Sequence, residues 1–247
     1  MKTGFLTDKG RRRKNNEDYV KIVDEIGLYL LADGVGGSRS GEVASKETVE
    51  SFANYLRLRI GDVKEEFDVI SLLEEAMDFV NMKIHILSNG NKEHEGMATT
   101  FVYAIIKDGN AYIGNVGDSR AYLIHNEEII QITDDHTYVN ELVKAGLLTK
   151  EEARKHTKKN IITRAIGADE VLKADLFTLP IEVGDKIVLC SDGLYDELTD
   201  EDILKITNKH EDMQICAKEL IEVANNCGGN DNISTICIKI MEEEHEQ

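Results

Sequence analysis

Apolar residues in this chain follow two spacings, and each spacing predicts one kind of secondary structure. Apolar positions at every third or fourth residue predict two long helices, at 38–60 and 65–87. Short apolar runs rich in β-branched and aromatic residues predict strands at 2–7, 19–23, 28–32, 99–107, 111–116, 121–124, 128–132, 171–179, 186–190 and 233–240. Shorter helices are predicted at 138–145, at 150–155, from Asp200 onward and at 213–224. This order is typical of a layered α+β domain.

The sequence shows no internal domain boundary. Its 247 residues are enough for a large core, and its single proline, Pro180, marks no proline-rich linker. We therefore predict one domain over 1–241, followed by an acidic, frayed tail at 242–247. The sequence contains neither a membrane-spanning apolar run nor a recognisable signal peptide, so we expect a cytoplasmic protein.

Charge and cysteine content narrow the possible partners. The chain has 47 acidic and 29 basic residues and a net charge of -18. Nucleic acid and anionic membranes repel such a chain, so we expect neither as a partner. Its 4 cysteines do not follow Cys-x-x-Cys or zinc spacings, so we expect reduced thiols and no disulfide. We expect a monomer.

Aspartates beside glycines are the main chemical signal. The apolar run 28–32 ends at Asp33, which a glycine-rich turn follows, and similar combinations recur at Asp118, Asp192 and Asp231. Four carboxylates at one end of a sheet repel one another strongly unless a cation lies between them. No His or Cys cluster accompanies them, so the ligands would be oxygens, which favours Mg²⁺ or Mn²⁺.

A basic run precedes the predicted strand at 19–23. Residues 11–14 read Arg-Arg-Arg-Lys, and Asn15-Asn16-Glu17-Asp18 follows directly. One interpretation is an exposed loop that offsets negative charge. The other is a site where an arginine binds phosphate oxygens beside a metal ion, because guanidinium and carboxylate groups come to the head of one strand.

Six short motifs together carry a family resemblance. They occur in one order over about residues 4–240, and six motifs in register are far more specific than any one of them. The sequence resembles the metal-dependent serine/threonine protein phosphatases of type 2C (the PPM family), in their short bacterial form. The motifs are RKNNED at 13–18, ADGVGG at 32–37, MATT at 97–100, GDSR at 117–120, SDG at 191–193 and DNIS at 231–234.

The resemblance implies a fold and an activity. The fold would be a β-sandwich of two antiparallel sheets flanked by α-helices, in four αββα layers. The activity would be hydrolysis of phosphoserine and phosphothreonine in proteins, by direct attack of a water or hydroxide that bridges two divalent metals, without a phosphoenzyme. Phosphorylated proteins would be the partners, among them a Ser/Thr kinase whose action the enzyme would reverse.

The resemblance also assigns metal ligands. Asp33 would bridge two metal ions, and the backbone carbonyl of Gly34 would bind one of them. Asp192 and Asp231 would complete the site of the other ion. Asp118, together with Asp192, would hold a third ion, so two to three Mg²⁺ or Mn²⁺ are expected.

Further residues are assigned by the same resemblance. Asp18 and Glu17 would bind the ion near Gly34, either directly or through water. Arg13 would bind the phosphate of the substrate.

The acid that protonates the leaving group stays open. Animal relatives carry a histidine, proposed as that acid, where this chain has Val35. A metal-bound water, bulk water, or a histidine of the polar, flap-like segment 136–167 could serve instead. The candidates in that segment are His136 and His156, for which a surface or structural role is the alternative interpretation.

Two rival functions compete with an active phosphatase. A catalytically inactive module of the same fold would bind phosphoproteins or a regulator, and would be favoured if Asp33, Asp192 or Asp231 were missing. All three are present. A plain acidic cation-binding protein would need neither Arg13 nor the ordered motifs. We therefore predict an active phosphatase.

Overall fold

Two antiparallel sheets form the centre of the computed structural model, which describes residues 1–35, 40–63, 65–90 and 92–242. One sheet has the strand order β1-β11-β10-β7-β8, and the other has the order β2-β3-β5-β6-β9, with β4 beside β3. The strands are β1 (Lys2–Asp8), β2 (Asp18–Val23), β3 (Leu28–Val35), β4 (Ala98–Thr99), β5 (Phe101–Lys107), β6 (Asn110–Val116), β7 (Arg120–His125), β8 (Glu128–Gln131), β9 (Asp175–Pro180), β10 (Lys186–Cys190) and β11 (Ile233–Lys239).

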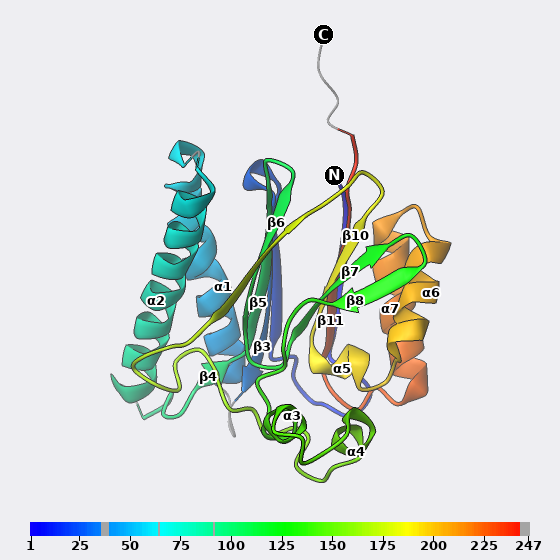
Figure 1. The fold of residues 1–247 in the computed structure, drawn as a ribbon. Coiled ribbons are helices and arrows are strands. Elements are labelled where there is room, and N and C mark those ends of the chain that lie inside the picture. Colours follow the sequence, from blue (N-terminus) through cyan, green and yellow to red (C-terminus); the bar gives the residue numbers. More distant parts are fainter. Residues whose placement is uncertain (36–39, 64, 91, 243–247) are drawn as a thin grey trace.

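Helices cover the outer faces of the two sheets (Figure 1). α1 and α2 pack on the sheet that contains β3, and α6 and α7 pack on the sheet that contains β11. The α-helices are α1 (Gly41–Arg57), α2 (Glu66–Gly90), α3 (Tyr138–Lys144), α4 (Lys150–Arg154), α5 (Asp192–Tyr195), α6 (Asp200–Lys209) and α7 (Met213–Cys227). This four-layer αββα arrangement confirms the predicted fold class.

The side-chain alternation of β3 places its aspartate at the end of the sandwich. Leu30 and Ala32 pack toward α1 and α2, whereas Tyr29 and Leu31 pack between the two sheets. Asp33 lies two residues after Leu31, so its side chain is on the inter-sheet side of the strand. The inward position that follows Tyr29 and Leu31 is therefore a carboxylate at the edge of an apolar core.

The glycine after this aspartate lets α1 approach the strand closely. A Cβ atom on Gly34 would lie 2.2 Å from the carbonyl oxygen of Gly41, the first residue of α1. The strand continues through Gly34 to Val35, so the prediction that it stops at Asp33 was wrong. Residues 36–39, which include the rest of the predicted turn and the predicted helix start at 38, lie outside the described residues.

Other predicted boundaries also need correction. The strand predicted at 171–179 begins only at Asp175, where its ladder with β6 starts, and Val171 is 85% exposed. The helix predicted to reach residue 60 ends at Arg57. The strand predicted at 186–190 is β10, and a short helix that was not predicted, α5, begins at Asp192 just after it. Residues 243–247 of the predicted tail are outside the described part of the chain.

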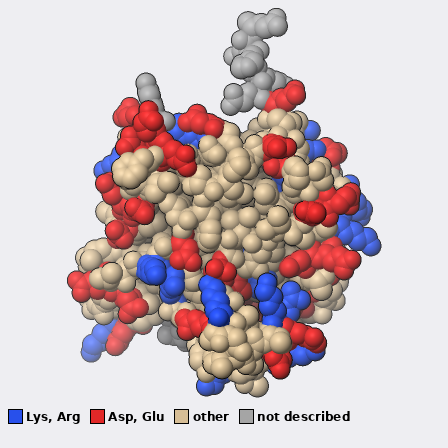
Figure 2. Space-filling view, in the orientation of Figure 1, with Lys and Arg blue, Asp and Glu red and all other residues tan. Residues whose placement is uncertain are grey.

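The surface shows an uneven distribution of charge. On the face shown in Figure 2, Lys and Arg side chains gather in the lower half, where α3 and α4 lie. A broad central region of this face carries neither acidic nor basic side chains. Within the described ranges, no helix is long and apolar enough to cross a bilayer.

Candidate metal centre

A polar cleft of about 190 Å³ opens at one end of the sandwich. The end of β3, the loop between β6 and β7, the start of α5 and the loop before β11 meet there. Its lining includes Arg13, Glu17, Asp33, Gly34, Val35, Thr100, Asp118, Asn160, Ile162, Asp192, Asp231 and Asn232. The four aspartates that the sequence predicted to act together therefore line one cleft.

Asp18 supports this cleft from behind rather than lining it. It pairs in register with Asp33 across the β2–β3 ladder, and it is buried. Its Oδ2 accepts a hydrogen bond of 2.8 Å from Ser191 Oγ, next to Asp192 in the chain. The Oδ1 atoms of Asp18 and Asp192 are buried and have no hydrogen-bond partner within the described ranges. Two carboxylate oxygens at the site are thus left without a donor.

Burial and mutual repulsion raise the pKa values of the clustered carboxyl groups. Burial, and then the charges of Asp18 and Asp192, hold the pKa of Asp33 well above its usual range. Burial, and then Asp118, do the same for the pKa of Asp192. The pKa of Asp118 rises to about 7, first through burial and then through Asp135. The negative charges are therefore costly at neutral pH unless a cation compensates them.

The donor chemistry of the cleft fits hard divalent cations. Every candidate ligand supplies oxygen, and two buried oxygens lack a partner. In the described part of the chain, no three acidic, His or Cys side chains are yet gathered closely enough to hold an ion. Cation binding would therefore have to draw carboxylates together.

Arg13 holds one of the predicted ligands. Its Nη2 lies 2.5 Å from Oδ2 of Asp231, and the two side chains are 53% and 28% exposed. Partial burial lowers the pKa of the Arg13 guanidinium, but the adjacent Asp231 raises it, and the net effect is a raised pKa. The pKa of Glu17 is raised chiefly by burial. The guanidinium thus lies at the cleft, beside a carboxylate that a metal would compete for.

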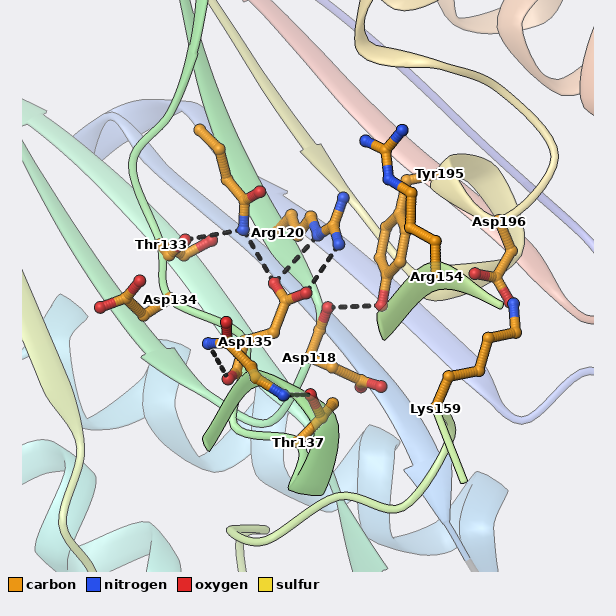
Figure 3. A network of polar contacts seen from close by, with 12 residues as sticks. Asp118, Arg120, Thr133, Asp134, Asp135, Thr137, Arg154, Lys159, Tyr195 and Asp196 are labelled. Carbon is orange, nitrogen blue, oxygen red and sulfur yellow. Dashed lines mark hydrogen bonds and ion pairs between the residues drawn. The ribbon is translucent and has the colours of Figure 1, made fainter. Parts of the chain in front are cut away.

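A polar network fixes the loop that carries Asp118 (Figure 3). Tyr195 of α5 donates a hydrogen bond of 3.0 Å from its hydroxyl to the backbone carbonyl of Asp118. The guanidinium of Arg120 lies 3.5 Å from the centroid of the Tyr195 ring and donates two hydrogen bonds, of 2.9 and 2.6 Å, to Asp135. Asn140 of α3 donates to the Asp135 carbonyl. The network joins the Asp118 loop, α5 and the start of the flap segment.

Both histidines proposed as acids lie in the flap segment, and neither lines the cleft. His136 is buried, and burial lowers its pKa. Its Nδ1 accepts a hydrogen bond from the Gly117 amide, so the ring proton is on Nε2, which lies 3.0 Å from Asp175 Oδ2. His156 lies beside Tyr138, with ring centroids 6.4 Å apart.

Several lining residues were not predicted as site residues. Asn160 and Ile162 reach the cleft from the flap segment, and Thr100 and Asn232 reach it from two of the six motifs. The motifs therefore contained a signal for Thr100 and Asn232. For Asn160 and Ile162 the only signal was the mixed polar character of the flap.

Comparisons with known proteins identify the family of this chain. The family described as protein phosphatase 2C matches residues 8–233. The chain belongs to the protein phosphatase 2C family. One relative is protein phosphatase PhpP of Streptococcus pneumoniae, which is 38% identical over 253 residues that cover 100% of both chains.

Solved structures of serine/threonine phosphatases share the fold. The serine/threonine phosphatase PstP/Ppp of Mycobacterium tuberculosis matches with a TM-score of 0.88 and 34% identity, over 97% of this chain and 98% of that chain. The catalytic domain of PstP in complex with 2 manganese ions matches with a TM-score of 0.85 and 33% identity, over 97% and 98%. The predicted family and the predicted enzyme class, a protein serine/threonine phosphatase, are confirmed.

Proposed function

We propose that this 2C-type phosphatase hydrolyses phosphoserine and phosphothreonine in proteins by direct attack of water at phosphorus, without a phosphoenzyme. The observation that carries the proposal is the cleft itself, where four aspartates, Glu17 and Arg13 come together. A phosphate dianion needs cations beside it, and the carboxylates would recruit them.

The oxygen donors of the cleft would bind two to three Mg²⁺ or Mn²⁺ ions. Asp33, the Gly34 carbonyl, Asp192 and Asp231 would hold two of them, with Asp18 and Glu17 in support. Asp118 with Asp192 would hold a third. The bound ions would lower the pKa of a water and neutralise charge on the phosphoryl group. The manganese complex of PstP supports this assignment.

The remaining groups of the cleft would bind and orient the substrate. Arg13 would turn from Asp231 to the phosphate oxygens once a cation takes over that carboxylate. No Ser, Cys or His with a free side chain lines the described cleft. Its one hydroxyl, on Thr100, is engaged with the Asp33 amide and with Ser119. This supports attack by water rather than by a hydroxyl, thiol or imidazole side chain.

Phosphoproteins, including a Ser/Thr kinase, are the proposed partners. The kinase follows from the family resemblance, and names of relatives such as PhpP support the phosphoprotein substrates. A single domain over 1–241, a cytoplasmic location and a monomeric state stay predictions.

Phosphate release from a phosphothreonine peptide tests the proposal. We expect hydrolysis with Mn²⁺, its loss in EDTA, and its loss in Asp33→Asn. Asp78→Asn, on the exposed face of α2, removes the same charge far from the cleft and should keep full activity. A native enzyme without activity in Mn²⁺, or one that stays active after metal is stripped by EDTA, would contradict the proposal.

A further inference from the structure

The turn at 11–14 presents four consecutive cations in a chain whose net charge is -18. Arg13 is paired with Asp231 in the cleft. Arg11, Arg12 and Lys14 are exposed, and none of them forms an ion pair with a residue that the structure describes. Three side chains of one turn are therefore free to meet an external anion.

The backbone of this turn is fixed although its side chains are free. The Asn232 amide donates hydrogen bonds of 3.0 and 2.8 Å to the carbonyls of Lys9 and Asn15, which lie at its two ends. The amides of Arg11 and Arg12 both donate to the Gly229 carbonyl, at 2.7 and 3.2 Å. The side chains are thus presented from a rigid base, which lowers the entropy lost when they bind an anion.

The turn lies at the rim of the cleft. Arg12 and Lys14 flank Arg13, a lining residue, and adjacent Cα atoms are about 3.8 Å apart. Arg11 packs near Gly229, in the loop that carries Asp231 into the cleft. The residues that flank a phosphorylated residue in the cleft would therefore lie near these cations.

We propose that Arg11, Arg12 and Lys14 select phosphoproteins that carry acidic residues next to the phosphorylated one. The inference rests on the proposed function, because it describes how the same cleft chooses its substrate. Over the molecule as a whole, the net charge of -18 repels a negatively charged peptide, but salt screens that repulsion beyond roughly 8 Å. At contact distance the local cations dominate the electrostatic interaction with the peptide. Acidic flanking residues therefore add binding free energy, whereas neutral or basic ones do not.

The proposed selection can be tested with three phosphothreonine peptides. They are identical except that the residues beside the phosphothreonine are acidic, neutral or basic. The probes are these peptides and p-nitrophenyl phosphate, which is too small to reach the rim. For the native enzyme we expect kcat/KM to be about 3- to 10-fold higher on the acidic peptide than on the neutral one. The preference should disappear in about 0.5 M salt.

Substitutions locate the preference. Arg11→Gln/Arg12→Gln, which leaves Lys14 in place, should cut the preference to about half or less, with p-nitrophenyl phosphate hydrolysis within about twofold of the native rate, and Arg11→Lys/Arg12→Lys should keep the preference. The matched control is Arg57→Gln/Arg59→Gln, an equal charge change at the far end of α1. The 17 residues of that helix place the control about 25 Å from the cleft end. It should keep the preference.

Three results would overturn the proposal that these cations select acidic substrates. The native enzyme could hydrolyse p-nitrophenyl phosphate and treat the acidic and neutral peptides alike. The Gln variant could lose activity equally on all substrates, which would show a general defect instead of lost selection. The control variant could lose the preference as fully as the rim variant, which would show an effect of net charge alone. Inactivity of the native enzyme on p-nitrophenyl phosphate with Mn²⁺ would instead overturn the proposed function, and with it the proposed selection of acidic substrates.

Discussion

Replacing Asp118 by Asn should stabilise the metal-free protein. Asp118 is buried in the cleft wall, and its pKa is raised from 3.8 to about 7, chiefly by burial. Because the folded pKa exceeds the ordinary one, ionisation of this group opposes folding. The penalty is absent below about pH 4, grows between about pH 4 and 7, and stays constant above.

The pKa values set the size of the effect. A rise of roughly three units at about 1.4 kcal/mol per unit gives a ceiling of about 4 kcal/mol above pH 7. Asn keeps a buried amide that needs partners, so we expect a gain of about 1–3 kcal/mol. For a chain of this size that corresponds to a rise of about 3–10 °C in the melting temperature.

Thermal unfolding in EDTA at pH 8 and pH 5 measures this gain. Asp118→Asn should melt above the native protein at pH 8, and the difference should shrink at pH 5. Added Mn²⁺ should narrow the gap, since only the native protein gains from neutralising Asp118. Asp78→Asn, an exposed substitution with the same charge change, should melt like the native protein. A variant that melts at or below the native temperature in EDTA at pH 8 would refute the reasoning.

Two further substitutions test how the cleft is built. Gly34→Ala would place a Cβ 2.2 Å from the Gly41 carbonyl oxygen, so it should lower the melting temperature sharply, whereas Gly61→Ala meets no atom within 4 Å and should be tolerated. Equal stability of the two variants would contradict the close approach of α1. Arg120→Ala would leave the largely buried Asp135 carboxylate unpaired, and should cost about 2–4 kcal/mol in chemical denaturation. Lys144→Ala, which breaks the exposed pair with Asp134, should cost under about 1 kcal/mol, and a similar loss in both would contradict the network.

The sequence predicted the layered fold and the grouping of the aspartates, because both depend on local patterns. A buried strand such as β10 is a continuous apolar run, and a carboxylate directly after it stands out. The family motifs then related Asp33, Asp118, Asp192 and Asp231 to a single site. The structure adds that these four residues line one cleft.

Features that depend on tertiary contacts were not predictable from the sequence. The start of β9 is set by its pairing with β6, because Val171 is apolar yet exposed, whereas Asp175 begins the ladder. The entry of Ile162 into the cleft follows from the path of the flap, which no periodic pattern encodes. Asn232 could be read as part of a motif, but its bonds to two carbonyls over 200 residues away could not.

The place of β11 in its sheet has a consequence for synthesis of the enzyme. β11 lies between β1 and β10 in the sheet, and its register with β1 pairs Lys2 with Lys239. The first strand of the chain is therefore hydrogen-bonded to the sheet only through the last strand. Until β11 has left the ribosome, β1 has no neighbour in the sheet, and the loop that carries Asp231 has no strand to hold it. Contacts this distant in sequence also form slowly. We therefore expect phosphatase activity to appear only after translation has passed residue 239, so a nascent chain would not dephosphorylate its surroundings.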